Sequence, residues 1–268
     1  MLSRYAFFTA CALALAACAT SQPGPTTPAR LQALGPADLL LLGEQHDAPE
    51  HQQIHAEVVR TLAQQGRLAA LALEMADAGS STAGLPRDAS EEAVQKALQW
   101  NDKGWPWSHY GPAVMAAVQA GVPVLGANLP RARMRDAMAD ATLDARLPPP
   151  ALLAQQDAIR TGHCNLLPET QTLPMTRIQV AKDLSMARTM EQAAQPGQVV
   201  VLMAGAGHVD RSLGVPVHLP GQLAYQAVRL RAGGARPGDD PQRFNAVWET
   251  PPVPPKDYCA GVTPKKSP

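Results

Sequence analysis

Short apolar runs alternate with longer amphipathic segments along the middle of the chain. Four of the runs are continuously hydrophobic, which is typical of strands buried on both faces of a sheet. They span residues 37–43, 67–77, 122–130 and 197–208. The segment after the first run, residues 49–66, places Ile54, Val58 and Leu62 at helical spacing. This alternation predicts an α/β fold with a mainly parallel central sheet and helices on both faces.

Start signals and amphipathic spacing predict further helices. Ser90 is followed by two acidic residues, which favours a helix start, and Pro112 suits the first turn of another helix. The predicted helices span residues 90–100, 110–121, 131–139, 150–160 and 176–194. Three later apolar segments, residues 215–220, 223–231 and 245–249, are predicted as strands near the edge of the sheet.

Polar residues that can take part in catalysis or ligand binding follow the ends of the four core strands. They are Glu44 with His46, Glu74, Asn128, and His208. Functional sites in parallel α/β folds form at the carboxyl ends of the strands, so we expect these side chains to meet at one edge. Loops are polar in general, and this alone would place some polar residues after strands. That four consecutive core strands each deliver a Glu, His or Asn favours a site.

The pattern Gly-x-x-His occurs twice, at Gly43–His46 and at Gly205–His208. Glycine allows the backbone to approach its neighbours closely. Imidazoles beside carboxylates suit either divalent-metal binding or acid–base catalysis. The candidate catalytic residues are Glu44, His46, Glu74 and His208, and the candidate metal ligands are His46 and His208. The alternative is that both histidines are capping or core residues without a chemical role.

Two other polar groups are interpreted as structural. His51 and His55 lie one helical turn apart, near the apolar stripe of the first helix. Gln179, Asp183 and Met186 share one face of a later helix, and such a face is more often a contact between helices than a ligand set. None of these five residues is predicted as a site residue. The alternative for the two histidines is that such a pair binds metal, or that one of them reaches the strand-end cleft.

The N-terminal residues indicate the compartment. Arg4 and the apolar stretch from Tyr5 to Ala17 resemble a secretory signal peptide, and the stretch is too short for a stable bilayer-spanning helix. Residues 15–18, Leu-Ala-Ala-Cys, resemble a bacterial lipobox, so residues 1–17 are predicted to be removed and Cys18 to be lipidated. An ordinary signal peptide with an incidental cysteine is the alternative. By analogy with enterobacterial lipoproteins, Ala19 favours the outer membrane.

Charge and cysteine content narrow the functional classes. The chain has 23 basic and 23 acidic residues, and loss of Arg4 with the signal leaves 22 against 23, a net charge of −1. Such a balance offers no electrostatic surface for nucleic acid. Cys164 and Cys259 remain after Cys11 leaves with the signal and Cys18 is lipidated. An even pair in an oxidising compartment predicts a structural disulfide, with a reactive thiol or a metal ligand as the alternative.

The composition of both ends bounds the globular part. Residues 18–30 are rich in Pro and Thr and are predicted to form a tether. One α/β domain is expected over residues 31–249. Residues 250–268 are again Pro-rich and are predicted to form an extended tail, pinned to the domain if Cys259 is bridged.

Seven motifs occur in order between about Leu39 and Leu219. They are LLGEQHD, LALEMAD, the spacing Trp107-x-x-Tyr110-x-Pro112, VPVLGANLPR, His163-Cys164 with Leu167-Pro168, QVAKDLSMA and VVVLMAGAGHVD. Together they resemble the ChaN family of the haem-binding-uptake, Tiki-like superfamily. The resemblance implies an EreA/ChaN-like α/β fold, a surface lipoprotein and haem binding in iron acquisition. In a haem-binding relative, dimerisation brings two haems face to face, with a tyrosine on iron.

Haem binding requires an axial ligand and apolar surface for the macrocycle. Tyr110 is the candidate ligand, because Trp105 and Trp107 beside it supply ring-stacking surface. The competing interpretation is that these aromatic residues pack a helix start into the core. His109 could also contact haem, although an exposed histidine at a helix start is the simpler interpretation.

The wider superfamily also contains metal-dependent proteases of the Tiki type and erythromycin-esterase-like hydrolases. They share the paired Gly-x-x-His pattern and a strand-end Glu, so the resemblance implies a hydrolytic site at the four candidate catalytic residues. Asn128 and Arg131 would hold a substrate carbonyl or carboxylate, or a haem propionate; otherwise Arg131 is a surface charge at a helix start.

The sequence therefore predicts a lipid-anchored haem-binding protein of haem and iron uptake. Its expected partners are haem, the membrane, a second copy of the chain and an outer-membrane haem receptor. The alternative function is a metal-dependent hydrolase.

Overall fold

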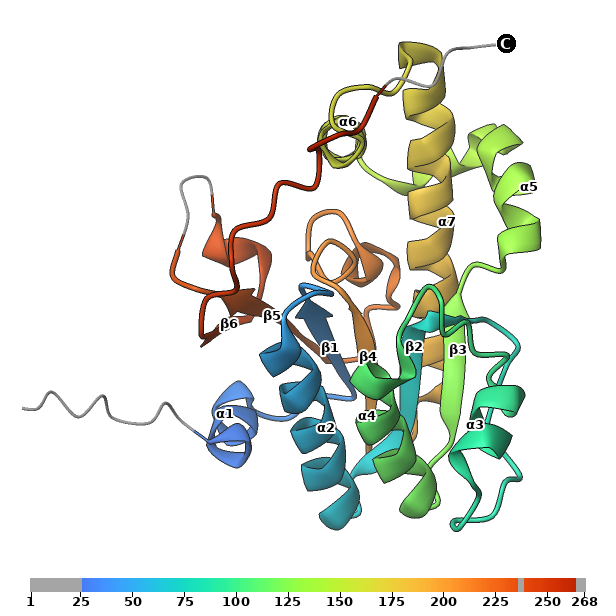
Figure 1. Ribbon diagram of the computed structural model, residues 1–268, viewed down its shortest axis with the longest axis vertical. Coiled ribbons are helices and arrows are strands. Elements are labelled where there is room, and N and C mark those ends of the chain that lie inside the picture. The colour runs from blue at the N-terminus through green and yellow to red at the C-terminus, as the bar shows by residue number, and fades with distance from the viewer. Residues whose placement is uncertain (1–25, 236–238, 264–268) are drawn as a thin grey trace, which may run out of the picture.

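One parallel sheet organises the chain. The computed structural model describes residues 26–235 and 239–263, and six strands within them pair in the order β3-β2-β4-β1-β5-β6, each parallel to its neighbours (Figure 1). The strands are β1 Leu39–Glu44, β2 Leu68–Asp77, β3 Val124–Asn128, β4 Val199–Gly205, β5 Tyr225–Ala232 and β6 Ala246–Thr250. The predicted α/β class and mainly parallel sheet are confirmed. The predicted signal peptide and Cys18 lie outside the described residues.

The four leucines of β1 show how the sheet acquires two apolar faces. Successive side chains of a strand point to opposite faces. Leu40 and Leu42 pack into a core with α2 (Pro49–Gln64) and α4 (Trp107–Gln119), whereas Leu39 and Leu41 pack on the other face against α7 (Glu169–Ala193). Figure 1 shows α2 and α4 on one side of the sheet and α7 on the other.

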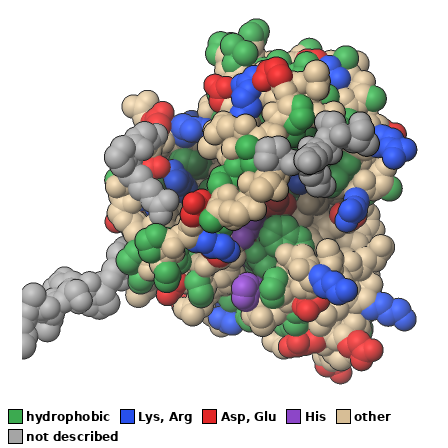
Figure 2. Space-filling model, turned by 45° about the horizontal axis from the view of Figure 1, so that its top comes forward, with side chains coloured by type: hydrophobic (Ala, Val, Ile, Leu, Met, Phe, Trp, Pro, Cys, Tyr) green, Lys and Arg blue, Asp and Glu red, His purple; other side chains and the backbone are tan. Residues whose placement is uncertain are grey.

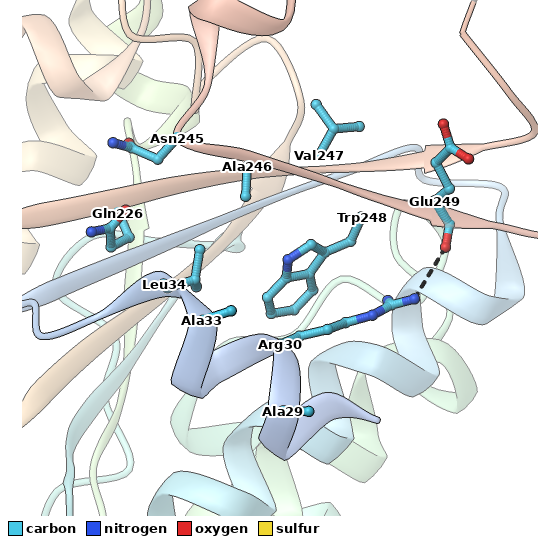
Figure 3. A pocket seen from close by; sticks show the side chains of 10 residues that line it. All are labelled: Ala29, Arg30, Ala33, Leu34, Gln226, Asn245, Ala246, Val247, Trp248 and Glu249. Carbon is cyan, nitrogen blue, oxygen red and sulfur yellow. Dashed lines mark hydrogen bonds between the residues drawn. The ribbon is translucent and has the colours of Figure 1, made fainter. Parts of the chain in front are cut away.

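A short helix precedes the sheet, so the predicted tether is too long. Residues 27–34 form α1 (Thr27–Leu34), with Pro28 in its first turn, a position that proline favours. Its apolar side, including Leu31 and Leu34, packs on the core. Arg30 lies over the Trp248 ring at 5.5 Å and donates a hydrogen bond to the Glu249 carbonyl, beside a cavity of about 640 Å³ (Figure 3). The globular domain thus begins near residue 27, not at 31.

A helical layer extends beyond the carboxyl ends of β2 and β3 (Figure 1). It contains α5 (Met134–Ala139), α6 (Pro149–Gly162) and the first half of α7, with a small apolar core of their own. Between β2 and α4, α3 (Glu91–Ala97) begins at Ser90, whose side chain accepts a hydrogen bond from the Ala93 amide. The long helix α7 begins at Glu169, seven residues before the predicted start, and accommodates Pro174.

One predicted strand is wrong. Residues 215–220 do not join the sheet; they contain the 3-10 helix η3 (Val215–His218). Pro216 lacks the backbone N–H that a strand ladder requires and its φ suits the start of a helical turn. The remaining 3-10 helices are η1 (Arg131–Arg133), η2 (Ala141–Arg146) and η4 (Pro241–Arg243). Among the described residues, no helix combines the length and apolarity needed to cross a membrane.

The C-terminal tail follows β6, whose last residue is Thr250. Residues 251–257 have no regular structure, and Cys259 then forms a disulfide with Cys164 in the turn between α6 and α7. The predicted disulfide is confirmed. In Figure 1 the tail, drawn in red, runs from β6 towards α6 and α7, and so links the edge strand of the sheet to the helical layer.

Candidate functional site

The carboxyl ends of β1, β2 and β4 open into one pocket of about 660 Å³. Figure 2 looks onto this end of the molecule and shows histidine side chains at a hollow that is partly lined by hydrophobic side chains. The pocket is lined by Glu44, Gln45, His46, Asp47, Glu74, Gln179, Gly205, Ala206, Gly207, His208, Lys256 and Tyr258. The structure therefore brings together the four residues predicted to carry catalysis.

Glu44, the last residue of β1, is a buried carboxylate with several donors around it. Its Oε1 accepts hydrogen bonds from the Tyr110 hydroxyl at 2.6 Å and from His46 Nδ1 at 2.7 Å. Its Oε2 lies 3.2 Å from Nδ1 of His55. Burial alone would raise the pKa of Glu44, but the His46 hydrogen bond and the neighbouring imidazoles outweigh it and lower the pKa. Glu44 is therefore ionised at neutral pH.

His46 presents its ring to the pocket. Its side chain is 43% exposed, and its ring edge meets the Trp105 ring at a centroid distance of 4.8 Å. Because an ionised carboxylate only accepts hydrogen bonds, Nδ1 carries the proton shared with Glu44, and Nε2 lies beside Gly205, which lines the pocket. Burial lowers the pKa of His46, but the Glu44 hydrogen bond and the charges of Glu74 and Glu44 raise it overall.

His208 occupies the matching position after β4 but is buried between two carboxylates. Nδ1 lies 2.5 Å from Asp183 Oδ1, and Nε2 lies 3.2 Å from Glu74 Oε1. Burial opposes its charge, yet Glu74 and Asp183 raise the pKa of His208 to about 10. Burial raises the pKa of Asp183 to about 6, whereas His208 holds the pKa of Glu74 well below its usual range. His208 is thus a fixed imidazolium.

Sequence reasoning missed Asp183 and Gln179. Both project from α7 towards His208, and the Gln179 amide nitrogen lies 3.0 Å from His208 Nδ1. Their four-residue spacing on one helical face was the available signal. Met186, on the same face, lies in the apolar core, so that face is partly a packing seam as predicted.

The two histidines of α2 have different structural roles. His51 Nδ1 accepts a hydrogen bond from the Gln45 amide and Nε2 lies 3.1 Å from the Thr250 hydroxyl, so this ring joins the β1–α2 loop to β6. His55 is fully buried beneath Glu44, and burial lowers its pKa to about 4. His55 therefore belongs to the surroundings of Glu44, a role that its sequence position did not reveal.

The structure places Tyr110, the predicted haem ligand, in the core and not among the residues that line the pocket. Tyr110 is 1% exposed and its hydroxyl donates a hydrogen bond to Glu44 at 2.6 Å, so its oxygen does not face the pocket. Burial and the Glu44 charge also raise the pKa of Tyr110, which disfavours a phenolate. The physical reason is position: Tyr110 lies on the inward face of α4, where the spacing from Trp107 and to Val114 is that of a core stripe.

Asn128 and Arg131 do not line the pocket. Asn128 donates from Nδ2 to the Glu74 carbonyl at 2.8 Å and so supports the end of β2 from the neighbouring strand. Arg131 is exposed at the start of η1, where its backbone amide faces Asp77 at 3.4 Å. No contact of either residue supports the predicted role in substrate binding.

The described parts of the chain contain no group of three or more His, Cys, Asp and Glu side chains arranged to hold a metal ion. Both nitrogens of His208 face carboxylates, and Nδ1 of His46 faces Glu44. The predicted divalent-metal site at His46 and His208 thus has no support.

Comparisons with known proteins agree with the resemblance noted in the motifs. The family described as "Haem-binding uptake, Tiki superfamily, ChaN" matches residues 30–219. A solved structure, "Cofacial heme binding to ChaN of Campylobacter jejuni", is 25% identical with a TM-score of 0.60, covering 77% of this chain and 86% of that chain. The type III effector HopBA1 is 15% identical with a TM-score of 0.49, covering 85% and 94%. No curated protein sequence matches the chain. The chain belongs to the ChaN family of the haem-binding-uptake, Tiki superfamily.

Proposed function

We propose that this chain binds haem in the strand-end pocket, with His46 as the iron ligand. One observation carries the proposal: His46 is a half-exposed imidazole at the pocket whose other nitrogen is held by a buried carboxylate. Histidine is a common axial ligand of haem iron, and a carboxylate on its second nitrogen fixes the tautomer and strengthens the donor. The solved ChaN relative is described as binding haem cofacially.

The residues around His46 fit such a ligand. The pocket volume lies within the range of cofactor sites, and Trp105 beside His46 offers an aromatic surface. Lys256 on the rim supplies a positive charge for a carboxylate. Bound haem would supply an iron centre that accepts an axial donor. Glu44 orients that donor, and because it also raises the pKa of His46, protons compete with iron for Nε2.

Hemin titration of the mature chain, followed by the Soret band, tests this proposal. His46→Gln should weaken hemin binding at least tenfold, because the amide removes the imidazole donor. His109→Gln is the matched control, since His109 is exposed on α4 and does not line the pocket. Equal affinities for the parent and the His46→Gln variant would contradict the assignment.

Acid–base hydrolysis is a second candidate function, favoured by the different protonation of the two histidines. His46 can exchange a proton with the pocket, whereas His208 keeps its proton because Glu74 and Asp183 hold both of its nitrogens. The wider superfamily includes hydrolases. Turnover of a panel of p-nitrophenyl esters and short peptides, insensitive to chelators and abolished by His46→Gln, would support it. Absence of turnover in the parent would reject it for that panel.

The chain's place in the cell is part of the same proposal. Cys18 would carry the lipid that anchors the mature protein to the outer membrane, where the chain would serve haem uptake as a homodimer and with an outer-membrane haem receptor. The lipobox-like residues 15–18 support the anchor. Cys18→Ala should move the protein from the membrane fraction to the soluble fraction. An unchanged membrane fraction would contradict lipid anchoring.

A further inference from the structure

The C-terminal tail is attached to the domain at two points near the strand-end pocket. Cys259 is bonded to Cys164 in the turn after α6. One residue earlier, the Tyr258 hydroxyl donates a hydrogen bond to the Asp47 carboxylate in the loop between β1 and α2. These two anchors lie on different elements, so the tail spans the space between them instead of following the surface of one element.

This attachment places tail side chains in the pocket wall. Lys256 and Tyr258 line the same cavity as His46, Glu74 and His208, although they follow His46 by about 210 residues. The Lys256 ammonium lies 5.0 Å from the centre of the Tyr258 ring, a cation–π contact that orients the lysine. The tail also lies beyond residues 30–219, the part that matches the family, so the family match assigns it no role.

The charges that line the pocket indicate a role for Lys256. The core contributes Glu44, Asp47, Glu74 and the imidazolium of His208. Glu44 pairs with His46, and His208 pairs with Glu74 and Asp183. Asp47 accepts the Tyr258 hydrogen bond, and that bond, with a smaller contribution from the Lys256 charge, lowers the pKa of Asp47. The residues that line the pocket include one lysine and no arginine, and that lysine, Lys256, belongs to the tail. A ligand that carries a carboxylate would therefore meet its cationic partner on the tail and not on the core.

We infer that the tail is a disulfide-anchored wall of the pocket and that Lys256 on it contacts a carboxylate of the bound ligand. The inference deepens the proposed haem function and rests on it for the identity of the ligand. In this arrangement His46 holds the ligand from the core and Lys256 holds it from the tail. The disulfide then strengthens ligand binding, because it keeps Lys256 at the pocket.

Hemin and its dimethyl ester separate the lysine contact from general binding, because esterification removes both carboxylate charges and keeps the macrocycle. The parent should bind hemin about tenfold more tightly than the ester. Lys256→Gln should reduce that preference to less than twofold, while Lys103→Gln, an exposed lysine outside the pocket, should keep it. A full preference in Lys256→Gln would overturn the contact.

The double variant Cys164→Ser, Cys259→Ser tests the wall. Hemin should leave this variant at least fivefold faster than it leaves the parent, measured by transfer to excess apomyoglobin. The same variant should also react faster with diethyl pyrocarbonate at His46 in the absence of ligand, with His109 as the internal reference. Equal hemin release rates, together with equal modification of His46, would overturn the wall.

The two readouts keep this inference distinct from the proposed function. If the parent binds neither hemin nor its ester, the haem proposal fails and the lysine contact fails with it. The modification rate of His46 still decides whether the tail covers the pocket, since it requires no ligand. Circular dichroism of each variant identifies any loss of fold.

Discussion

His46 and His208 end the same Gly-x-x-His pattern, yet the protein places them in opposite environments. His46 is 43% exposed at its side chain and is held by one carboxylate, whereas His208 is 8% exposed and lies between two. The first pattern, Gly-Glu-Gln-His, supplies the carboxylate of its own histidine, Glu44, whereas the second, Gly-Ala-Gly-His, supplies none. His208 instead meets Glu74 from β2 and Asp183 from α7, which covers that loop. The chemical role of a strand-end histidine is therefore set by the element that covers it.

The two glycines of the pattern show how tightly the loops pack. A Cβ added to Gly43 would lie 2.2 Å from Val209 Cγ2 and 2.9 Å from the Ala206 backbone. A Cβ on Gly205 would meet the imidazole of His46, 2.9 Å from Nε2. The two strand ends thus pack closely against each other, and Gly205, the last residue of β4, leaves the space in which His46 lies.

The largest expected effect comes from making the same substitution at both histidines. His208→Gln should lower the free energy of unfolding by about 3–5 kcal/mol, because it leaves Asp183 and Glu74 buried without their cation. His46→Gln should cost less than about 1 kcal/mol, since solvent screens its pair with Glu44. Urea unfolding of both variants measures the difference, and equal losses would show that the two histidines contribute equally to stability.

The pH dependence of stability should separate the two histidines next. The pKa of His208 is raised to about 10, so its contribution to stability is complete below its unfolded pKa near 6.5 and is lost as pH rises through about 10. The parent's advantage over His208→Gln should therefore shrink by roughly 2–4 kcal/mol over that window. Unfolding at several pH values measures it, and a constant advantage would show that His208 is not a buried cation.

The sequence predicts the sheet well because its evidence is local. Each continuous apolar run became a core strand, and the rule that strand ends converge located Glu44, His46, Glu74 and His208. The predictions that failed depend on contacts between residues far apart in the sequence. Asp183 reaches His208 because α7 crosses the strand ends, a packing angle that helical spacing does not encode.

The tail shows the same limit. Two cysteines were enough to predict that it is pinned, but nothing local indicated that pinning would bring Lys256 to the pocket. For Tyr110 the local signals conflicted. Its aromatic neighbours suggested a haem surface, whereas the three-to-four-residue spacing on α4 places its ring in the core.

A smaller effect is expected from Tyr110→Phe, which removes one donor from Glu44 and keeps the ring in the core. The free energy of unfolding should fall by about 1.5–3 kcal/mol, the range for a hydrogen bond to a charged group. Hemin affinity should change less than twofold, because His46 still holds Glu44. Tyr225→Phe, on β5, is the matched control. Loss of the Soret band in Tyr110→Phe would restore Tyr110 as the iron ligand.

The smallest loss of stability is expected for Gly205→Ala, which should nevertheless weaken hemin binding. Gly205→Ala places its methyl group against the imidazole of His46, the far end of a side chain that can move, so the free energy of unfolding should fall by less than about 1 kcal/mol. Hemin affinity should fall about tenfold, or about 1.4 kcal/mol, because the displaced ring loses its alignment with Glu44. Gly43→Ala meets the backbone of Ala206 instead and should cost about 1–3 kcal/mol of stability. If Gly205→Ala binds hemin as the parent does, the space beside Gly205 is not what positions His46, and the ligand role of His46 loses its geometric basis.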